Sequence, residues 1–169
     1  MIRLVAVLLL TCFYSEESSS NIDDYFRFPI QPSSANLGNT GILEMPNAKF
    51  MEPGSMRIGF SASYPYEYTS FNATPFAWME ANYRYTEIKN KLYGPSSYSG
   101  NQSLKDKGFD IKVRLLQESF YRPSVAIGLR DIAGTGLFAS EYIVATKNIK
   151  NLDFTLGLGW GQLGGADNI

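Results

Sequence analysis

Residues 109–115 read Phe-Asp-Ile-Lys-Val-Arg-Leu, with an apolar side chain at every odd position and a charged one at every even position. Side chains of a β-strand point alternately to its two faces, so this stretch predicts a strand with one apolar and one charged face. In a helix of 3.6 residues per turn the same charges would spread around the whole circumference. The stretch therefore indicates β-structure with two chemically distinct sides.

The same period of two recurs in five other segments. Even positions are apolar or aromatic across residues 56–64, and odd positions are apolar across residues 79–86 and 125–130. Apolar residues also alternate with Gly and Thr in residues 154–161, whereas residues 138–147 are strand-like but less cleanly sided. Turn-forming residues separate the segments, at Tyr64-Pro65, Gly94-Pro95, Arg122-Pro123, Gly134-Thr135-Gly136, residues 148–151 and Gly164-Gly165. The pattern predicts an all-β protein, an antiparallel meander of six strands.

Alternation fits either a soluble β-sandwich or a membrane β-barrel, and the polar face distinguishes between them. A sandwich face in bulk water usually carries many Lys and Glu residues, whereas this face combines small residues with nearby opposite charges, such as Glu80 and Arg84. The apolar face carries six aromatic residues, Tyr64, Tyr83, Tyr85, Phe109, Tyr142 and Trp160. Several of them lie near strand ends, as in the aromatic girdles of membrane barrels. We therefore favour part of an outer-membrane β-barrel.

In that architecture each strand has a lipid side and an inward side. The lipid side would include Ile58, Val113, Ile127 and Leu156, and the inward side Arg57, Lys112, Arg130 and Thr155. The connections at residues 120–123 and 148–152 are short, whereas residues 89–106 form a long polar excursion, an asymmetry typical of outer-membrane barrels. Six strands are fewer than the roughly eight that a barrel needs. We expect the amino-terminal fragment of a longer polypeptide or, as the alternative, an open sheet completed by another subunit.

The amino terminus carries an export signal. Arg3 precedes the apolar run Leu4–Leu10, which is too short to cross a bilayer as a helix, so residues 1–14 are predicted to be a signal peptide. Cys12 is a candidate lipidation site in a degraded lipobox, and the alternative is a cysteine removed with the signal. Residues 15–36 begin with four acids and four serines among residues 15–24, and we interpret them as a polar linker before a barrel domain at residues 37–169.

Composition excludes several functions. The chain has no histidine and a single cysteine, so His-based nucleophile systems, His-ligated metals, Cys-rich zinc sites and internal disulfides are excluded. Its net charge of -1 does not provide the positive field of a nucleic-acid-binding protein. Residues 128–136 contain a Gly-x-Gly element without the lysine of a phosphate-binding loop, so no nucleotide is expected. The sequence predicts no metal and no cofactor.

Two groups of candidate site residues follow from the pattern. A ladder of charges in or beside the strands could hold water and bind acidic sugars, although pairing of charges inside a small barrel is the interpretation we favour. The ladder comprises Glu80, Arg84, Asp110, Lys112, Arg114, Arg130, Asp131 and Glu141. Trp78, Tyr93 and Tyr98 are candidates for stacking on sugar rings, with anchoring at an interface as the simpler alternative.

Several sequence blocks, in order, resemble the YjbH family of Gram-negative envelope proteins, relatives of the capsule protein GfcD. The blocks are Gly38–Pro46, Tyr64-Pro65-Tyr66, Pro75–Glu80, Tyr83–Thr86, Lys105–Asp110, Gly128–Asp131, Gly134–Phe138, Ser140-Glu141-Tyr142 and Asp153–Gly161. The family tends to have Pro-Thr-Ala-Arg where this chain has Pro46-Asn47-Ala48-Lys49, a departure that keeps the charge. The resemblance implies a longer protein, an outer-membrane barrel and exopolysaccharide production, and it supplies no catalytic residues to carry over.

These observations predict a non-catalytic protein of the bacterial outer membrane that takes part in exopolysaccharide or capsule export or surface assembly. Its partners would be outer-membrane lipid, the exopolysaccharide and other envelope polysaccharide-export proteins. One alternative is a soluble periplasmic β-sandwich that binds carbohydrate or partners a synthesis complex. A further alternative is a polysaccharide hydrolase or lyase that uses two of the carboxylates of Glu80, Asp110 and Glu141.

Overall fold

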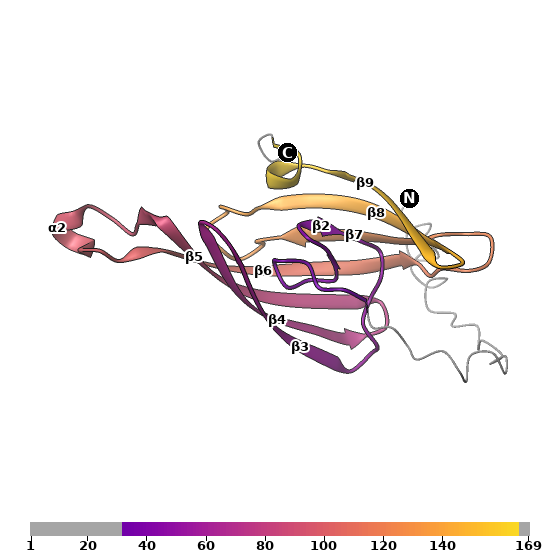
Figure 1. Ribbon diagram of the computed structural model, residues 1–169. Coiled ribbons are helices and arrows are strands. Elements are labelled where there is room, and N and C mark those ends of the chain that lie inside the picture. The colour runs from indigo at the N-terminus through magenta and orange to yellow at the C-terminus, as the bar shows by residue number, and fades with distance from the viewer. Residues whose placement is uncertain (1–31, 166–169) are drawn as a thin grey trace, which may run out of the picture. The chain divides into compact units, whose positions relative to one another are not determined.

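The computed structural model describes residues 32–165, which form antiparallel β-structure with very little helix (Figure 1). Seven strands make one sheet in chain order, β3-β4-β5-β6-β7-β8-β9, and each pairs antiparallel with its neighbour. They are β3 Ser55–Ser63, β4 Tyr66–Phe76, β5 Met79–Leu92, β6 Ser103–Leu116, β7 Ser124–Arg130, β8 Ser140–Ile149 and β9 Leu152–Gly159. The all-β antiparallel meander predicted from the sequence is confirmed.

The remaining elements are short. β1 Gly41–Ile42 and β2 Met45–Pro46 pair with each other in a two-stranded sheet. The helical elements of the described region are α2 Ser96–Ser99 and the 3-10 turn η2 Gly161–Leu163. No helix within residues 32–165 is long and apolar enough to span a membrane.

The large sheet has one strand more than the six expected, because β4 does not alternate cleanly in hydropathy. Its inward positions include Tyr68, Ser70 and Asn72, and its outward positions mix Glu67 with Phe71. Both faces therefore read as mixed, although Tyr, Thr and Phe favour extended structure. The strand is recognisable from composition and from the turn before it, and not from its period.

Alternate residues of the sheet divide into an apolar outer face and a polar inner face. Ile58 and Leu156 on the outer face are 65% and 81% exposed, whereas Arg84 and Lys112 on the inner face are 0% and 2% exposed. The exposed outer face consists of Met56, Ile58, Phe60, Phe71, Phe109, Ile127, Leu129, Ile143, Phe154, Leu156 and Leu158. This arrangement is the reverse of a water-soluble sheet, which buries its apolar side.

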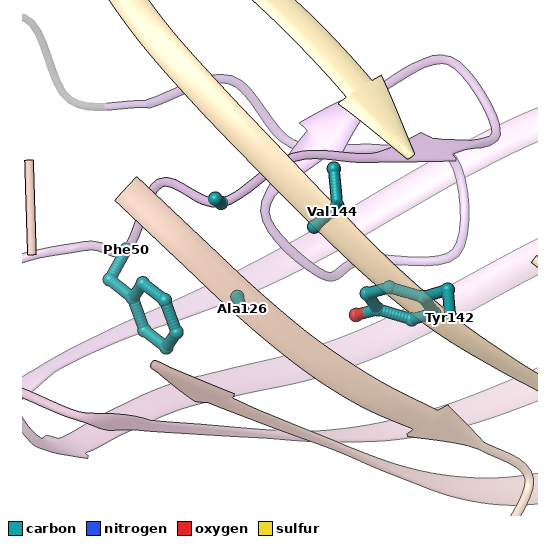
Figure 2. Close-up of a cluster of buried hydrophobic side chains, with 5 residues drawn as sticks. Phe50, Ala126, Tyr142 and Val144 are labelled. Atoms are coloured by element: carbon teal, nitrogen blue, oxygen red, sulfur yellow. The ribbon is translucent and has the colours of Figure 1, made fainter. Parts of the chain in front are cut away.

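One aromatic residue assigned to the outer face lies on the inner one. Tyr142 is 6% exposed and stands opposite Gly128 in the register of β7 and β8. Because Gly128 has no side chain, the Tyr142 ring can lie over it, and Ala126 and Val144 join the same cluster (Figure 2). Tyr142 is therefore a core residue and not part of a girdle.

The loops differ between the two rims of the sheet. The long-loop rim carries the connections at residues 93–102 and 131–139 together with the tight turn at 64–65. The short-turn rim carries the turns at 77–78 and 150–151 and the connection at 117–123. Both ends of the predicted excursion at residues 89–106 are strand, because β5 continues to Leu92 and β6 begins at Ser103, with α2 between them (Figure 1).

Residues 32–51, which we call the inner segment, lie against the inner face (Figure 1). Two small clusters pack between this segment and the sheet. The first contains Ala48, Phe50, Ala126, Tyr142 and Val144, and the second contains Leu37, Tyr68, Ile88 and Phe138. The expected signal peptide and most of the expected linker lie outside the described residues, whereas Ser34 pairs with Thr40 in an isolated bridge.

Substitution of Gly128 by Ala should destabilise the fold. A Cβ atom at Gly128 would lie 2.2 Å from Cζ of Tyr142, so the ring must move out of its place in the cluster. Overpacking of this kind costs about 1–3 kcal/mol, more than the gain from removing a glycine from a strand. Urea unfolding of the full-length protein in detergent, followed by circular dichroism, should show a lower midpoint.

Gly94→Ala provides the matched control, because the nearest atom to its new methyl group would be Cδ1 of Tyr98 at an ordinary 3.7 Å. Equal midpoints for the two variants would contradict the packing described for Tyr142.

Candidate functional site

The charged side chains of the central strands gather on the inner face. Glu80 and Arg84 occupy alternate inward positions of β5, and Asp110 and Lys112 do so on β6. Arg130 ends β7 on the same face, and all five side chains are buried. A strand places every second residue on one side, so the spacing alone brings these charges together.

Glu80 and Lys112 form a buried ion pair across β5 and β6. They are direct partners in the strand register, and Nζ of Lys112 lies 3.2 Å from Oε2 of Glu80. The backbone amide of Thr40 donates to Oε1 of Glu80 at 2.9 Å, and the hydroxyl of Thr40 donates to Oε2. Nζ of Lys112 also donates to the carbonyl oxygen of Lys49 at 2.8 Å. A buried pair is tolerated when further hydrogen bonds satisfy both ions, and the inner segment supplies them here.

Arg84 and Asp110 form a second buried pair beside the first. Nη1 of Arg84 lies 3.3 Å from Oδ1 of Asp110, and Asp110 also accepts hydrogen bonds from Nδ2 of Asn82 and the amide of Asp131, both at 2.9 Å. The guanidinium of Arg84 lies over the Phe138 ring, 4.8 Å from its centroid. This pair therefore joins β5 and β6 to the loop that follows β7.

The inner segment is held mainly through its backbone. Its carbonyl oxygens accept hydrogen bonds from inward side chains of successive strands, the amide of Ala48 donates to the hydroxyl of Thr146, and one side-chain ion pair completes the set. The contacts are Arg57 to Pro32, Asn72 to Gly38, Asn82 to Leu37, Lys112 to Lys49, Arg130 to Glu44, Ser124 to Ala48, Ala48 to Thr146, and Lys49 with Asp153. These partners come from all seven strands of the large sheet. One segment of 20 residues can reach both edges because the sheet is curled around it.

Seven of the eight predicted ladder residues lie on or next to this inner face. Arg114 is on the inner side, 4.3 Å from the centroid of the Phe50 ring. Asp131 follows β7 and accepts a hydrogen bond from the amide of Phe138 at 3.2 Å. The observed contacts pair charges and fix the loop and the inner segment. Binding of acidic sugars by the ladder stays a prediction.

Glu141 does not belong with the other seven residues. It stands opposite Leu129 in the register, on the outer face of β8. Ser140, Tyr142 and Val144 occupy the inward positions of β8, so the residue between Ser140 and Tyr142 must face outward. Glu141 is therefore on the other side of the sheet from Glu80 and Asp110. It cannot act together with either of them as a pair of carboxylates on one substrate.

The predicted sugar-stacking residues lie at two separate places. Trp78 is in the turn between β4 and β5 on the short-turn rim, stacked on Phe76 with ring centroids 5.6 Å apart. Tyr93 and Tyr98 are on the long-loop rim and are 55% and 82% exposed. Only the two tyrosines can share a ligand. Cys12 lies outside the described residues.

Sequence reasoning missed the inner segment and the amides that bind it. The run Gly38-Asn39-Thr40-Gly41 consists of turn-forming residues, and it lacks the alternation that marks a strand. Asn72 and Asn82 carried a usable signal, because Asn is depleted in strands and both occupy inward positions. A polar residue that binds a backbone is the physical reason for such an exception. Among residues 32–165, no cluster of three or more acidic or cysteine side chains could hold a metal ion.

Breaking one partner of the Glu80–Lys112 pair should strongly destabilise the protein. Glu80→Gln leaves the Lys112 ammonium buried without its counter-ion, a loss of about 3–5 kcal/mol. The double variant Glu80→Gln/Lys112→Met removes both charges, so its urea midpoint should lie well above the value expected from adding the two single losses.

The control is Glu67→Gln, which removes the partner of Lys89 in an exposed ion pair. That variant should unfold at nearly the wild-type urea concentration, because exposed pairs contribute little. Strictly additive losses at Glu80 and Lys112 would contradict the coupling described here.

Comparisons with known proteins identify relatives of this chain. A family model described as "Exopolysaccharide biosynthesis protein YbjH" matches residues 33–169. A relative from Escherichia coli (strain K12), "Uncharacterized lipoprotein YjbH", is 39% identical over 170 residues, which cover 100% of this chain and 23% of the relative. The chain thus spans less than a quarter of the length of that relative. No solved structure matches significantly.

The family match covers the inner segment and all seven strands of the large sheet, and the identity extends over the whole chain. The chain belongs to the YjbH family of exopolysaccharide biosynthesis proteins.

Proposed function

We propose that residues 37–165 form part of an outer-membrane β-barrel that takes part in exopolysaccharide export or surface assembly without catalysing a reaction. The observation that carries this proposal is the reversed sidedness of the sheet, with apolar side chains exposed outside and charges buried inside. The proposal has three physical supports, which are the outer face, the inner face and the free edges of the sheet.

The outer face has the chemistry of a surface that contacts hydrocarbon. Phe60, Ile58 and Leu158 are 79%, 65% and 67% exposed, and they belong to a face that continues from β3 to β9. Water-soluble proteins rarely expose contiguous apolar patches above a few hundred Å². Transfer of each such side chain from water to hydrocarbon is worth about 1.5–3 kcal/mol, so a lipid environment would strongly favour this face.

The inner face has the chemistry of a narrow barrel interior. Glu80 is paired with Lys112 and Arg84 with Asp110, and the inner segment lies against them. Transmembrane strands need about 9–11 residues when tilted, and β3 to β6 have 9, 11, 14 and 14. β7 and β9, with 7 and 8 residues, are close to this length.

The two edge strands support a larger barrel. β3 and β9 each pair with one neighbour within the described residues, so each leaves a row of backbone groups unpaired. A sheet in a bilayer must be closed, because hydrocarbon cannot satisfy these groups. We propose that further strands of the polypeptide complete the barrel, for which the greater length of the Escherichia coli relative leaves room.

The family description supports a role in exopolysaccharide production, and the name of the relative supports lipidation of an exported protein. We extend both to this chain as proposals, with Cys12 as the lipidated residue. Other export proteins of the envelope would be its partners. The carboxylates do not favour catalysis, because Glu80 and Asp110 are each held in an ion pair and Glu141 faces the opposite side.

Membrane fractionation of the full-length protein tests the proposal. The protein should remain in the outer-membrane pellet after a wash at high pH and should require detergent for extraction. Deletion of its gene should reduce secreted exopolysaccharide, and the wild-type copy should restore it. Recovery as a soluble periplasmic protein would contradict the barrel and favour the β-sandwich alternative.

A single charge on the outer face should impair assembly. Ile127→Arg places a guanidinium in hydrocarbon, at a cost of about 2–4 kcal/mol near the bilayer centre, so less protein should reach the washed membrane fraction. Phe120→Arg is the control, because Phe120 is 84% exposed in the loop between β6 and β7. Equal yields of the two variants would contradict a lipid-facing Ile127.

A further inference from the structure

The ribbon that extends from β5 and β6 is the most prominent projection of the sheet. We call residues 89–102 the tongue; it comprises the end of β5, α2 and the residues that lead to the start of β6 (Figure 1). β4 begins at Tyr66, which pairs with Ile88, so the strand pairing of β5 with β4 ends where the tongue begins. Nothing in the strand pairing of the sheet requires this extension.

The tongue is an ordered structure. The amide of Tyr93 donates to the carbonyl oxygen of Gln102 at 2.9 Å and joins its two sides. The hydroxyl of Ser99 donates to the carbonyl oxygen of Gly94 at 2.9 Å. The amide of Gly100 donates to the carbonyl oxygen of Ser96 at 3.0 Å. The exposed side chains are therefore presented from a fixed backbone, which lowers the entropy lost on binding.

The chemistry of the tongue matches an anionic sugar polymer. It contains two lysines and no acidic residue; Lys89 is already held by Glu67 in an exposed ion pair, so Lys91 is the cation that we assign to a ligand. Tyr93 and Tyr98 are 55% and 82% exposed, so both rings are accessible to a ligand. Tyrosine rings stack on the apolar faces of sugar rings, and the tyrosine hydroxyl can form hydrogen bonds with sugar hydroxyls. Ammonium groups attract the carboxylates of acidic sugars.

The inner segment indicates which rim faces the periplasm. It begins at the short-turn rim, where Pro32 accepts a hydrogen bond from Arg57 near the start of β3. It ends at the same rim, where Phe50 lies against Arg114 near the end of β6. Both ends of the inner segment therefore lie at the short-turn rim, and short turns face the periplasm in outer-membrane barrels. The tongue is on the opposite rim and therefore faces the cell exterior.

We infer that the tongue is a cell-surface contact site for the exported anionic polysaccharide, with Tyr93, Tyr98 and Lys91 as its binding residues. This inference rests on the proposed function, because the two rims face different compartments only if the barrel spans the outer membrane. It goes beyond that function by assigning the orientation, the binding element and the charge of the polymer.

Orientation is tested first, in intact cells that produce the full-length protein. Ser97→Cys places a thiol on the tongue, and Asn151→Cys places one in the turn between β8 and β9 on the other rim. A membrane-impermeant maleimide should label the first and spare the second, relative to the wild-type background. Labelling of Asn151→Cys in intact cells with protection of Ser97→Cys would overturn the inference.

Binding is tested with the full-length protein in detergent micelles and a polyuronate, alginate, as the probe. Tyr93→Ala/Tyr98→Ala should weaken alginate binding roughly tenfold, the effect of losing two stacked rings. Lys91→Gln should weaken it further and should reduce its dependence on salt. The matched control is Phe120→Ala/Tyr121→Ala, which removes two rings that are 84% and 92% exposed on the short-turn rim.

The outcomes separate this inference from the proposed function. A membrane-embedded protein with an exposed tongue that binds alginate equally well in all variants would overturn the inference and leave the barrel intact. Tongue variants that no longer bind purified lipopolysaccharide but still bind alginate would also overturn it, because the ligand would then be an outer-leaflet lipid. A protein that leaves the membrane without detergent would overturn the barrel itself.

Discussion

The structure depends on the buried ion pair between Glu80 and Lys112 and on the hydrogen bonds that support it. Glu80 and Lys112 face each other across two central strands, and their ion pair is stable only because Thr40 and Lys49 of the inner segment supply the missing hydrogen bonds. The segment in turn is held by inward side chains from strand after strand, so the sheet must curl around it. Because successive side chains of a strand point to opposite faces, the apolar side chains then lie on the outer face.

As a result, the sheet exposes its apolar face and buries its charged face. Its two apolar clusters are small, and each fits between the inner segment and the sheet. Most of its large apolar side chains lie on the opposite side, from Ile58 on β3 to Leu158 on β9. A bilayer would bury them, which supports the proposed place in the outer membrane.

The strands and their sidedness could be predicted from the period of two. Alternate residues of a strand belong to opposite faces, so a strand with one apolar and one polar face has an alternating sequence. β4 escaped because its inward Ser70 and Asn72 and its outward Thr69 are all polar. The inner segment was not predicted for a different reason. Inward side chains of the sheet bind its backbone atoms, and these atoms are the same for every residue type, so the sequence does not mark them. Glu141 and Tyr142 were misplaced because β8 carries an acid on its outer side and an aromatic ring on its inner side. The ring is there because it covers Gly128, a contact that depends on the register with β7.

The most direct measurement of this account is the accessibility of nitroxide spin labels in native outer-membrane vesicles containing the full-length protein. Labels replacing Ile58, Ile127 and Leu156 should relax in the presence of oxygen, which dissolves in hydrocarbon, and should be insensitive to a water-soluble nickel chelate. A label at Phe120 in the loop between β6 and β7 should show the opposite response. If the nickel chelate reaches Ile127 and Leu156 as readily as Phe120, the outer face contacts water and the account is wrong.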